Sequence, residues 1–133
     1  MTKLRDGNDV AIFGSGIMVS KALEAAKALE LEGISVRVLN ISTIKPLDRE
    51  AVIRYASGVD AIVTAEEHTI IGGIGSAVVE ALRGVSHAPV EFVGVPDTFG
   101  ISAEGYGELL THFKLTSEEV ARTVRTLLKG DKK

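Results

Sequence analysis

The stretch that decides the fold is Thr64 to Val79, TAEEHTIIGGIGSAVV. It continues a strand-like apolar run at residues 60–64 (DAIVT) and leads into a segment whose apolar residues recur at helical spacing. Three ionisable residues, Glu66, Glu67 and His68, stand between the two. Polar residues just past the carboxyl end of a strand in an α/β protein are where such folds place ligands and interfaces. We therefore expect function to be concentrated here.

The composition is that of a single globular domain. The chain has 133 residues, 45% of them hydrophobic and 25% charged, which suffices for one core. The absence of cysteine excludes disulfides, thiolate metal sites and cysteine nucleophiles. Neither a signal-like start nor a bilayer-length apolar run is present, so we expect a cytoplasmic protein without membrane contact. A net charge of -3, with the two signs interspersed, argues against a nucleic-acid partner.

Upstream of residue 60 the pattern predicts a strand, a helix and a second strand. Val10–Phe13 (VAIF) is a continuously apolar run, typical of a strand covered on both faces. It stops at a glycine-rich turn in which Ser15 is the expected N-cap of the helix. Gly33 is the expected left-handed end of that helix, and Ser35–Ile41 is the next extended run. The predicted inward stripe of the helix consists of Met18, Ala22, Ala25, Ala26 and Leu29.

Further strand and helix signals complete the pattern. Asp48 is a predicted cap for a short helix over residues 49–56, and Gly84 is the predicted end of the helix that begins in the stretch quoted above. Val90–Val95 is the fourth core strand, and Thr116 with Glu119 forms a capping box for the last helix. Repeated strand–helix units with short connections predict an α/β fold, a three-layer α/β/α sandwich with a mostly parallel sheet.

The first turn of the chain has the composition of an anion site. Gly14, Ser15, Gly16 and Ile17 lie between a strand and a helix, where free backbone N–H groups favour an anion. The turn resembles half of a dinucleotide fingerprint, but Val19 stands where the third glycine belongs. We favour a tight turn that needs glycine for its geometry, and a phosphate site stays open as an alternative.

Glu66, Glu67 and His68 allow two interpretations, one catalytic and one structural. A histidine beside carboxylates is suited to general acid–base work. Consecutive residues on an extended chain, however, point to alternate sides, so the three cannot all converge. We favour a carboxylate that caps or pairs within the fold and a histidine at the surface or at a subunit contact. His87 and His112 stand alone, and no spacing of histidines and acids predicts a metal site.

Two further segments are candidates for contact with another chain. Gly72, Gly73 and Gly75 are dense enough to allow close approach of a ligand or of another backbone. Asp97 and Phe99 lie in a loop where an aromatic residue has no evident local role, which is a mild interface signal.

Several blocks of sequence, in order, resemble the C-terminal domain of transketolase and of its relatives, deoxyxylulose-phosphate synthase and the β subunits of thiamine-dependent 2-oxoacid dehydrogenases. The blocks are LRDGNDVAIFGSG, VRVLNISTIKPLD, EEHTIIGGIGSAV, GVPDTFGISA and LLTHFKLTSEEV, and together they cover almost the whole chain. EEHTIIGGIGSAV is most similar to transketolase itself. Ala103 and Lys114 depart from the family pattern, since relatives often have glycine at both places.

The resemblance implies a five-stranded sheet with an antiparallel N-terminal edge strand near Lys3–Arg5. It implies that residues 1–133 are a single C-terminal-type domain of a ketol-transferring enzyme of the pentose phosphate pathway, and that the chain is inactive when isolated. In the family, thiamine diphosphate and Mg²⁺ are held by an N-terminal domain through a GDG motif, and the pyrimidine is met by the middle domain. This chain carries neither, so the resemblance implies no cofactor bound by this chain and partners in the N-terminal and middle domains of a homodimer.

Two hypotheses of different class follow. In the first, the chain is a transketolase C-terminal domain that is catalytically silent alone and contributes subunit contacts through residues 66–75 and 96–102. In the second, it is a regulatory module that binds an anion or a nucleotide at the turn over residues 14–17.

Overall fold

The computed structural model describes residues 1–42, 47–69, 73–95 and 115–130, with the backbone alone at residues 68, 69 and 95. The described elements are five strands and four helices, and their bounds are as follows. The strands are β1 (Thr2–Arg5), β2 (Val10–Gly14), β3 (Val36–Asn40), β4 (Ala61–Thr69) and β5 (Val90–Val95). The helices are α1 (Met18–Glu30), α2 (Arg49–Ala56), α3 (Ile74–Ala81) and α5 (Ser117–Leu128).

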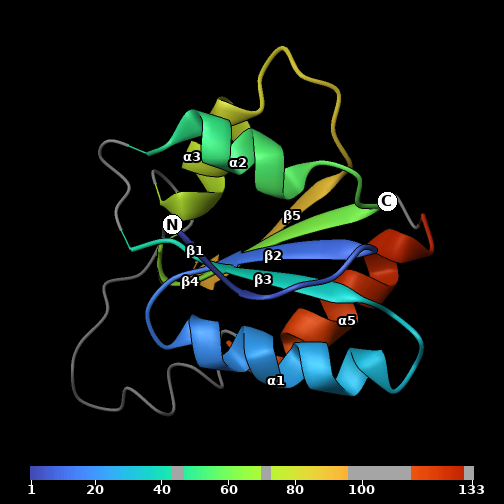
Figure 1. Cartoon of the computed structure of the whole chain (residues 1–133). Helices are drawn as coiled ribbons and strands as arrows, with labels where there is room; N and C mark the ends of the chain where they lie inside the picture. Colours follow the sequence, from blue (N-terminus) through green and yellow to red (C-terminus); the bar gives the residue numbers. More distant parts are fainter. Residues whose placement is uncertain (43–46, 70–72, 96–114, 131–133) are drawn as a thin grey trace, which may run out of the picture.

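The strands form one five-stranded sheet in the order β1-β3-β2-β4-β5. β2 pairs parallel with β3 and with β4, β4 pairs parallel with β5, and β1 pairs antiparallel with β3. Figure 1 shows α1 and α5 on one side of the sheet and α2 and α3 on the other. The predicted three-layer sandwich is thereby confirmed, together with its antiparallel N-terminal edge strand.

Burial on both faces of the sheet explains why the middle strands are continuous apolar runs in the sequence. Every residue of β2 is buried, because helices cover the sheet on both faces. Its alternate side chains enter two separate clusters: Val10 and Ile12 join the cluster under α1 and α5, whereas Ala11 and Phe13 join the cluster under α2 and α3. The core therefore lies in two layers, one on each face of the sheet.

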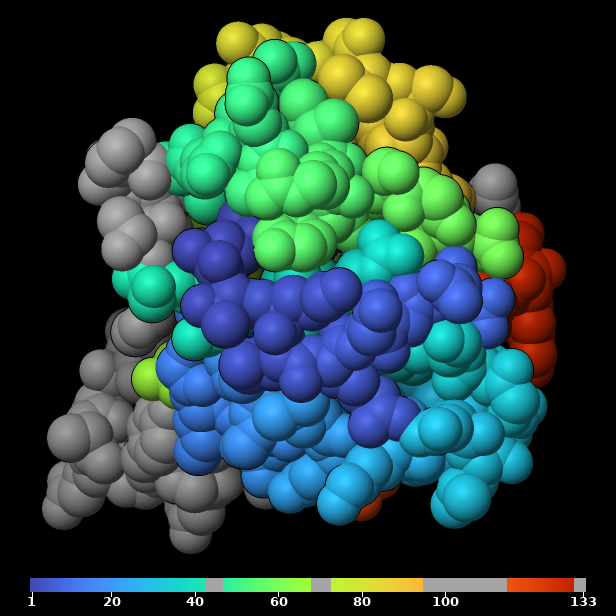
Figure 2. All heavy atoms as spheres, in the orientation of Figure 1, coloured from blue at the N-terminus to red at the C-terminus, as the bar shows by residue number. Residues whose placement is uncertain are grey.

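Strand β1 lies at the surface. Thr2, Lys3 and Leu4 are exposed, and the strand is only four residues long. Figure 2 shows these first residues, in dark blue, across the front of the molecule between α2 above and α1 below. A short exposed strand carries no apolar alternation, which is why only the family resemblance predicted it.

The helix ends follow the predicted signals, with one correction. Asp48 accepts a hydrogen bond from Ala51 N–H (3.1 Å) at the start of α2, and Thr116 accepts one from Glu119 N–H (3.1 Å) at the start of α5. Ser15, in contrast, is not the N-cap of α1. That helix begins at Met18 after Ile17, and no side chain of its own turn caps it.

Among the described residues, no helix is long and apolar enough to span a bilayer.

Candidate functional site

The site lies where the chain reverses its direction of winding. From β2 the chain moves to β3 on one side and then returns past β2 to β4 on the other. In an open α/β sheet the crevice at such a switch point, outside the carboxyl ends of the strands, is the usual binding place. Here a crevice of about 310 Å³ opens between the ends of β2, β3 and β4, lined in part by Ser15, Asn40, Ser42, Glu66 and Glu67.

Glu66 serves as the N-terminal cap of α3. Its side chain is only 2% exposed. Its two carboxylate oxygens accept hydrogen bonds from Ile74 N–H (3.0 Å to Oε1) and Gly75 N–H (3.2 Å to Oε2). These are backbone donors that a helix leaves without an intrahelical partner, and a negative charge at this end also suits the helix dipole. The carboxylate therefore stabilises the fold at this point.

The glycines that follow Glu66 make room for this contact. A Cβ atom at Gly73 would lie 2.1 Å from Glu66 Oε1, a distance that requires the carboxylate to move. A Cβ atom at Gly75 would lie 2.9 Å from both the Phe92 ring and Thr64 Oγ1. The sequence indicated that another group approaches these glycines closely. At Gly73 that group is the carboxylate of Glu66, and at Gly75 it is the side chains of strands β4 and β5 of the same chain.

Glu67 supplies the cap that Ser15 does not. Its Oε1 accepts a hydrogen bond from Ile17 N–H (3.1 Å), fifty positions earlier in the chain. Gly16 adopts a left-handed conformation with φ of 61°, and a Cβ atom there would lie 3.0 Å from the same oxygen. The anion that the glycine-rich turn favours is therefore, in this structure, a carboxylate of the chain itself.

The two adjacent carboxylates point to opposite layers of the molecule. Successive side chains of a strand project to opposite faces of the sheet. Glu66 therefore reaches α3 on one face, and Glu67 reaches the start of α1 on the other. We name this pair, Glu66 with Glu67, the carboxylate clasp. Both residues line the crevice, but each carboxylate bonds to the start of a different helix.

Several predicted residues lie outside what the structure describes. The backbone of His68 belongs to β4, and the structure does not describe its side chain. Gly72, Asp97 and Phe99 fall outside the described residues. Their expected contribution to an interface stays a prediction.

The described residues do not fit the cofactor and metal that the resemblance implies for a complete enzyme. No group of three or more histidine, cysteine, aspartate and glutamate side chains among them is placed to hold a metal ion. The N–H of Ile17 and those of Ile74 and Gly75, which would suit a diphosphate, already bond to carboxylates. A diphosphate at either helix start would meet a negative charge, so we derive no cofactor chemistry from these residues.

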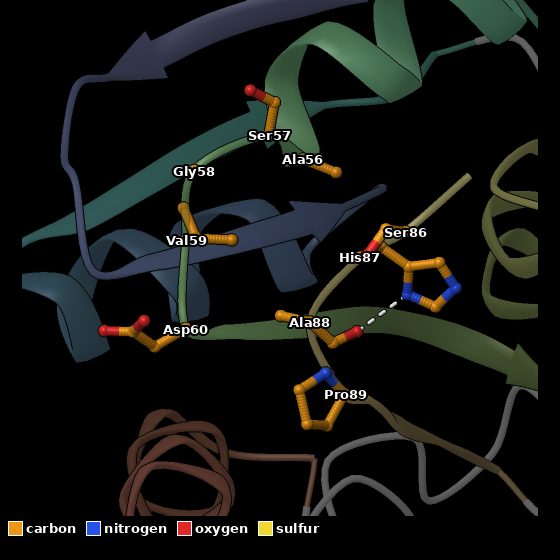
Figure 3. A pocket seen from close by; sticks show the side chains of 9 residues that line it. All are labelled: Ala56, Ser57, Gly58, Val59, Asp60, Ser86, His87, Ala88 and Pro89. Atoms are coloured by element: carbon orange, nitrogen blue, oxygen red, sulfur yellow. Dashed lines mark hydrogen bonds between the residues drawn. The ribbon is translucent and has the colours of Figure 1, made fainter.

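A second pocket, of about 410 Å³, lies at the opposite end of β4 and contains serine, histidine and aspartate side chains. His87 Nδ1 lies 2.8 Å from the Ala88 carbonyl oxygen. Figure 3 shows the Asp60 carboxylate and the His87 imidazole pointing away from each other. Because the two do not meet, the pocket does not form the hydrogen-bonded chain of a serine hydrolase, consistent with the interpretation of His87 as a lone surface histidine.

Sequence reasoning missed two features of the site. One is the bond between Glu67 and Ile17, which joins segments that only the folded sheet brings together. The other is Thr64, whose side chain is fully buried and whose hydroxyl oxygen has no hydrogen-bond partner among the described residues. A threonine in a strand is ordinary by pattern, so no signal in the sequence marks it.

Comparison with known proteins places these features in a family context. A family model described as "Transketolase, C-terminal domain" matches residues 1–120. The chain is 47% identical over 120 residues to the 6-deoxy-6-sulfo-D-fructose transketolase subunit SqwH of Clostridium sp. (strain MSTE9), covering 90% of this chain and 37% of that protein. It is 43% identical over 131 residues to 1-deoxy-D-xylulose-5-phosphate synthase of Heliobacterium modesticaldum, covering 97% of this chain and 20% of that one.

Solved structures give the same picture. A split-gene transketolase, solved as an inactive β4 tetramer, superposes with a TM-score of 0.87 at 48% identity and covers 96% of this chain and 42% of that chain. Transketolase from Leishmania mexicana superposes with a TM-score of 0.70 at 30% identity and covers 96% of this chain and 18% of that chain. The chain thus spans less than half the length of each of these relatives.

Proposed function

Because the chain belongs to the transketolase C-terminal domain family, we propose that it is the structural and interface domain of a transketolase-type enzyme. In this proposal, thiamine diphosphate and Mg²⁺ are bound by N-terminal and middle domains, and ketol transfer between sugar phosphates takes place there. This chain contributes subunit contacts and no catalytic group. Its expected partners are those domains and, in the complete enzyme, a second copy of the assembly.

The observation that carries the proposal is the carboxylate clasp. Among the described residues that line the crevice at the usual binding edge of this fold, the acids are Glu66 and Glu67, and both accept hydrogen bonds from backbone N–H groups at helix starts. A group that caps a helix gains stability from remaining ionised and in place, whereas a general acid or base must exchange a proton with substrate. The clasp therefore supports a structural role for this edge.

The surface next to the clasp supports the interface role. Ile17 is 38% exposed at the start of α1, so its apolar side chain is accessible to a partner at this edge. The segments proposed for contact, residues 66–75 and 96–102, include or follow the last residues of β4 and β5 in the sequence. That a solved relative is a tetramer is compatible with subunit contacts through such a domain.

The experiment is a ketol-transfer assay with thiamine diphosphate, Mg²⁺, a ketose phosphate donor and an aldose phosphate acceptor. The chain alone should give no turnover above the buffer control, while a complete transketolase gives turnover in the same mixture. Adding the chain to cofactor-binding domains of a related split enzyme should raise their activity, and an Ile17→Arg variant should raise it less. Turnover by the chain alone would overturn the proposal.

The rival function, anion or nucleotide binding at the turn over residues 14–17, is tested by thermal denaturation with phosphate and nucleotides. A ligand at about 100 times its dissociation constant would stabilise the fold by about 2.7 kcal/mol. Since Glu67 occupies the Ile17 N–H, we expect no such stabilisation. A saturable rise in melting temperature that Glu67→Gln enhances would favour the rival.

A further inference from the structure

The two edges of the sheet differ in how they are protected. An edge strand presents unpaired N–H and C=O groups, and proteins protect the edges that must not pair, with short strands, irregularities and charges. β1 has all three: four residues, an irregular register between Lys3 and Arg5, and the charges of these two residues. β5 has six residues, VEFVGV, and one charge, Glu91; its register with β4 is regular over Val90–Val93 and shifts only beyond Val93.

The free backbone groups of β5 can be assigned to particular residues. Ile62 N–H donates to the Pro89 carbonyl oxygen (2.9 Å), which sets the alternation along the strand. Because backbone groups alternate in direction, odd-numbered residues of β5 face β4, and Val90, Phe92 and Gly94 present their N–H and C=O to the open edge. Among the described residues, no strand pairs with that edge.

The surroundings of β5 carry both apolar and mixed-charge surface. On the α3 side, Phe92 lies beside Gly75, and Val79, one helical turn after Gly75, is 40% exposed. On the α5 side, a groove of about 380 Å³ is lined by side chains of both signs, among them Glu91, Glu119 and Arg122. Glu119 and Arg122 bond to each other within the chain, with Glu91 on the same groove, so this surface carries both signs and can face a second copy of itself without an excess of either.

We propose that β5 pairs antiparallel with β5 of a second copy of this chain, about a two-fold axis perpendicular to the sheet. Two-fold contacts use the same patch on both partners, as this requires. With the axis at Phe92, Val90 pairs with Gly94 of the second copy and Glu91 stands opposite Val93, so no like charges face each other directly. The proposal concerns β5 and not the carboxyl edge of the sheet, and it does not rest on the proposed function.

The first test is the association of the full chain, measured by sedimentation equilibrium. Val90→Pro removes one outward N–H without removing a bond to β4. It should weaken the dimer by about tenfold or more, because two symmetric hydrogen bonds at the seam, one from each copy, are lost and the strands are pushed apart. Leu31→Ser is the control, since Leu31 is 91% exposed beyond the end of α1 and should leave association unchanged. Circular dichroism verifies that both variants are folded.

The second test measures where the copies meet and does not depend on the proline variant. The chain has no cysteine, so a single introduced cysteine takes one spin label. From strand spacing and rise, the two Cα atoms at Glu91→Cys should lie about 8 Å apart, which broadens the spectrum, while those at Lys3→Cys should lie about 43 Å apart. A chain that stays monomeric, or a dimer in which the labels at position 91 are remote, would overturn the proposal. The proposal would also be overturned if β5 paired only with a strand of another protein and not with β5 of a second copy.

Discussion

Replacing Glu66 by glutamine should weaken the fold more than the same change at Glu67. Glutamine keeps the shape of Glu66 and one carbonyl acceptor, but it places an NH₂ donor toward the N–H of Ile74 or Gly75. Losing a hydrogen bond to a charged group costs about 1.5–3 kcal/mol, and losing the charge at the helix start costs about 0.3–1 kcal/mol more. Because Glu66 is buried, we expect about 2–4 kcal/mol in total.

Glu67 is the matched control. It is half-buried and makes one hydrogen bond, to Ile17 N–H, which the carbonyl of glutamine can still accept. Glu67→Gln should therefore cost only about 0.5–1 kcal/mol, the part due to charge. Urea denaturation followed by far-UV circular dichroism measures both free energies of unfolding, and the slope with denaturant should stay unchanged. Equal losses for the two variants, within about 0.5 kcal/mol, would refute the reasoning.

A double-mutant cycle isolates the contact between Gly73 and Glu66. A Cβ atom at Gly73 would lie 2.1 Å from Glu66 Oε1, so Gly73→Ala should displace the carboxylate and cost about as much as Glu66→Gln. In a Glu66→Ala background the carboxylate that obstructs the new methyl group is gone. Gly73→Ala should then lower the free energy of unfolding by roughly 1 kcal/mol less, or a larger difference, than it does in the parent chain. Additive losses would show that Gly73 is needed for some other reason.

Three further predictions concern stability. Thr64→Val should stabilise the chain by about 1 kcal/mol in urea denaturation, because it replaces a buried hydroxyl that has no hydrogen-bond partner among the described residues. Thr116→Ala should cost about 1 kcal/mol by the same measurement, because Glu119 N–H loses its cap. The hydrogen bond from Arg125 lowers the pKa of Glu32. The hydrogen bond therefore contributes to stability above pH 4.5, and this contribution is lost as the pH falls below that value. The melting temperatures of Glu32→Gln and of the parent chain should accordingly converge toward acidic pH.

Local signals predicted most of the fold. We could predict strands β2 and β5 from their apolar runs, and the starts of α2 and α5 from the caps Asp48 and Thr116. Each of these signals depends on residues within a few positions of one another. β1 was different: its four exposed residues have no pattern of their own, and their pairing with β3 depends on the finished sheet. The prediction came from family resemblance.

The contacts of Glu66 and Glu67 could not be predicted. The sequence placed both acids just past a strand ending at Thr64, whereas β4 continues to Thr69 and contains them; alternation along an extended chain did indicate that they diverge. Which backbone groups they reach depends on where α1 and α3 begin in space. For Glu67 the partner is Ile17, and the expected cap, Ser15, lost that role because the carboxylate of β4 reaches the turn from across the sheet.

The central claim is that the reactive equipment of the enzyme lies outside this chain, and calorimetric titration with thiamine diphosphate and Mg²⁺ tests it most directly. The account predicts no saturable heat at ligand concentrations up to about 1 mM, which corresponds to a binding free energy weaker than about -4 kcal/mol. Saturable binding with one cofactor per chain, abolished by substitutions around the carboxylate clasp, would contradict it.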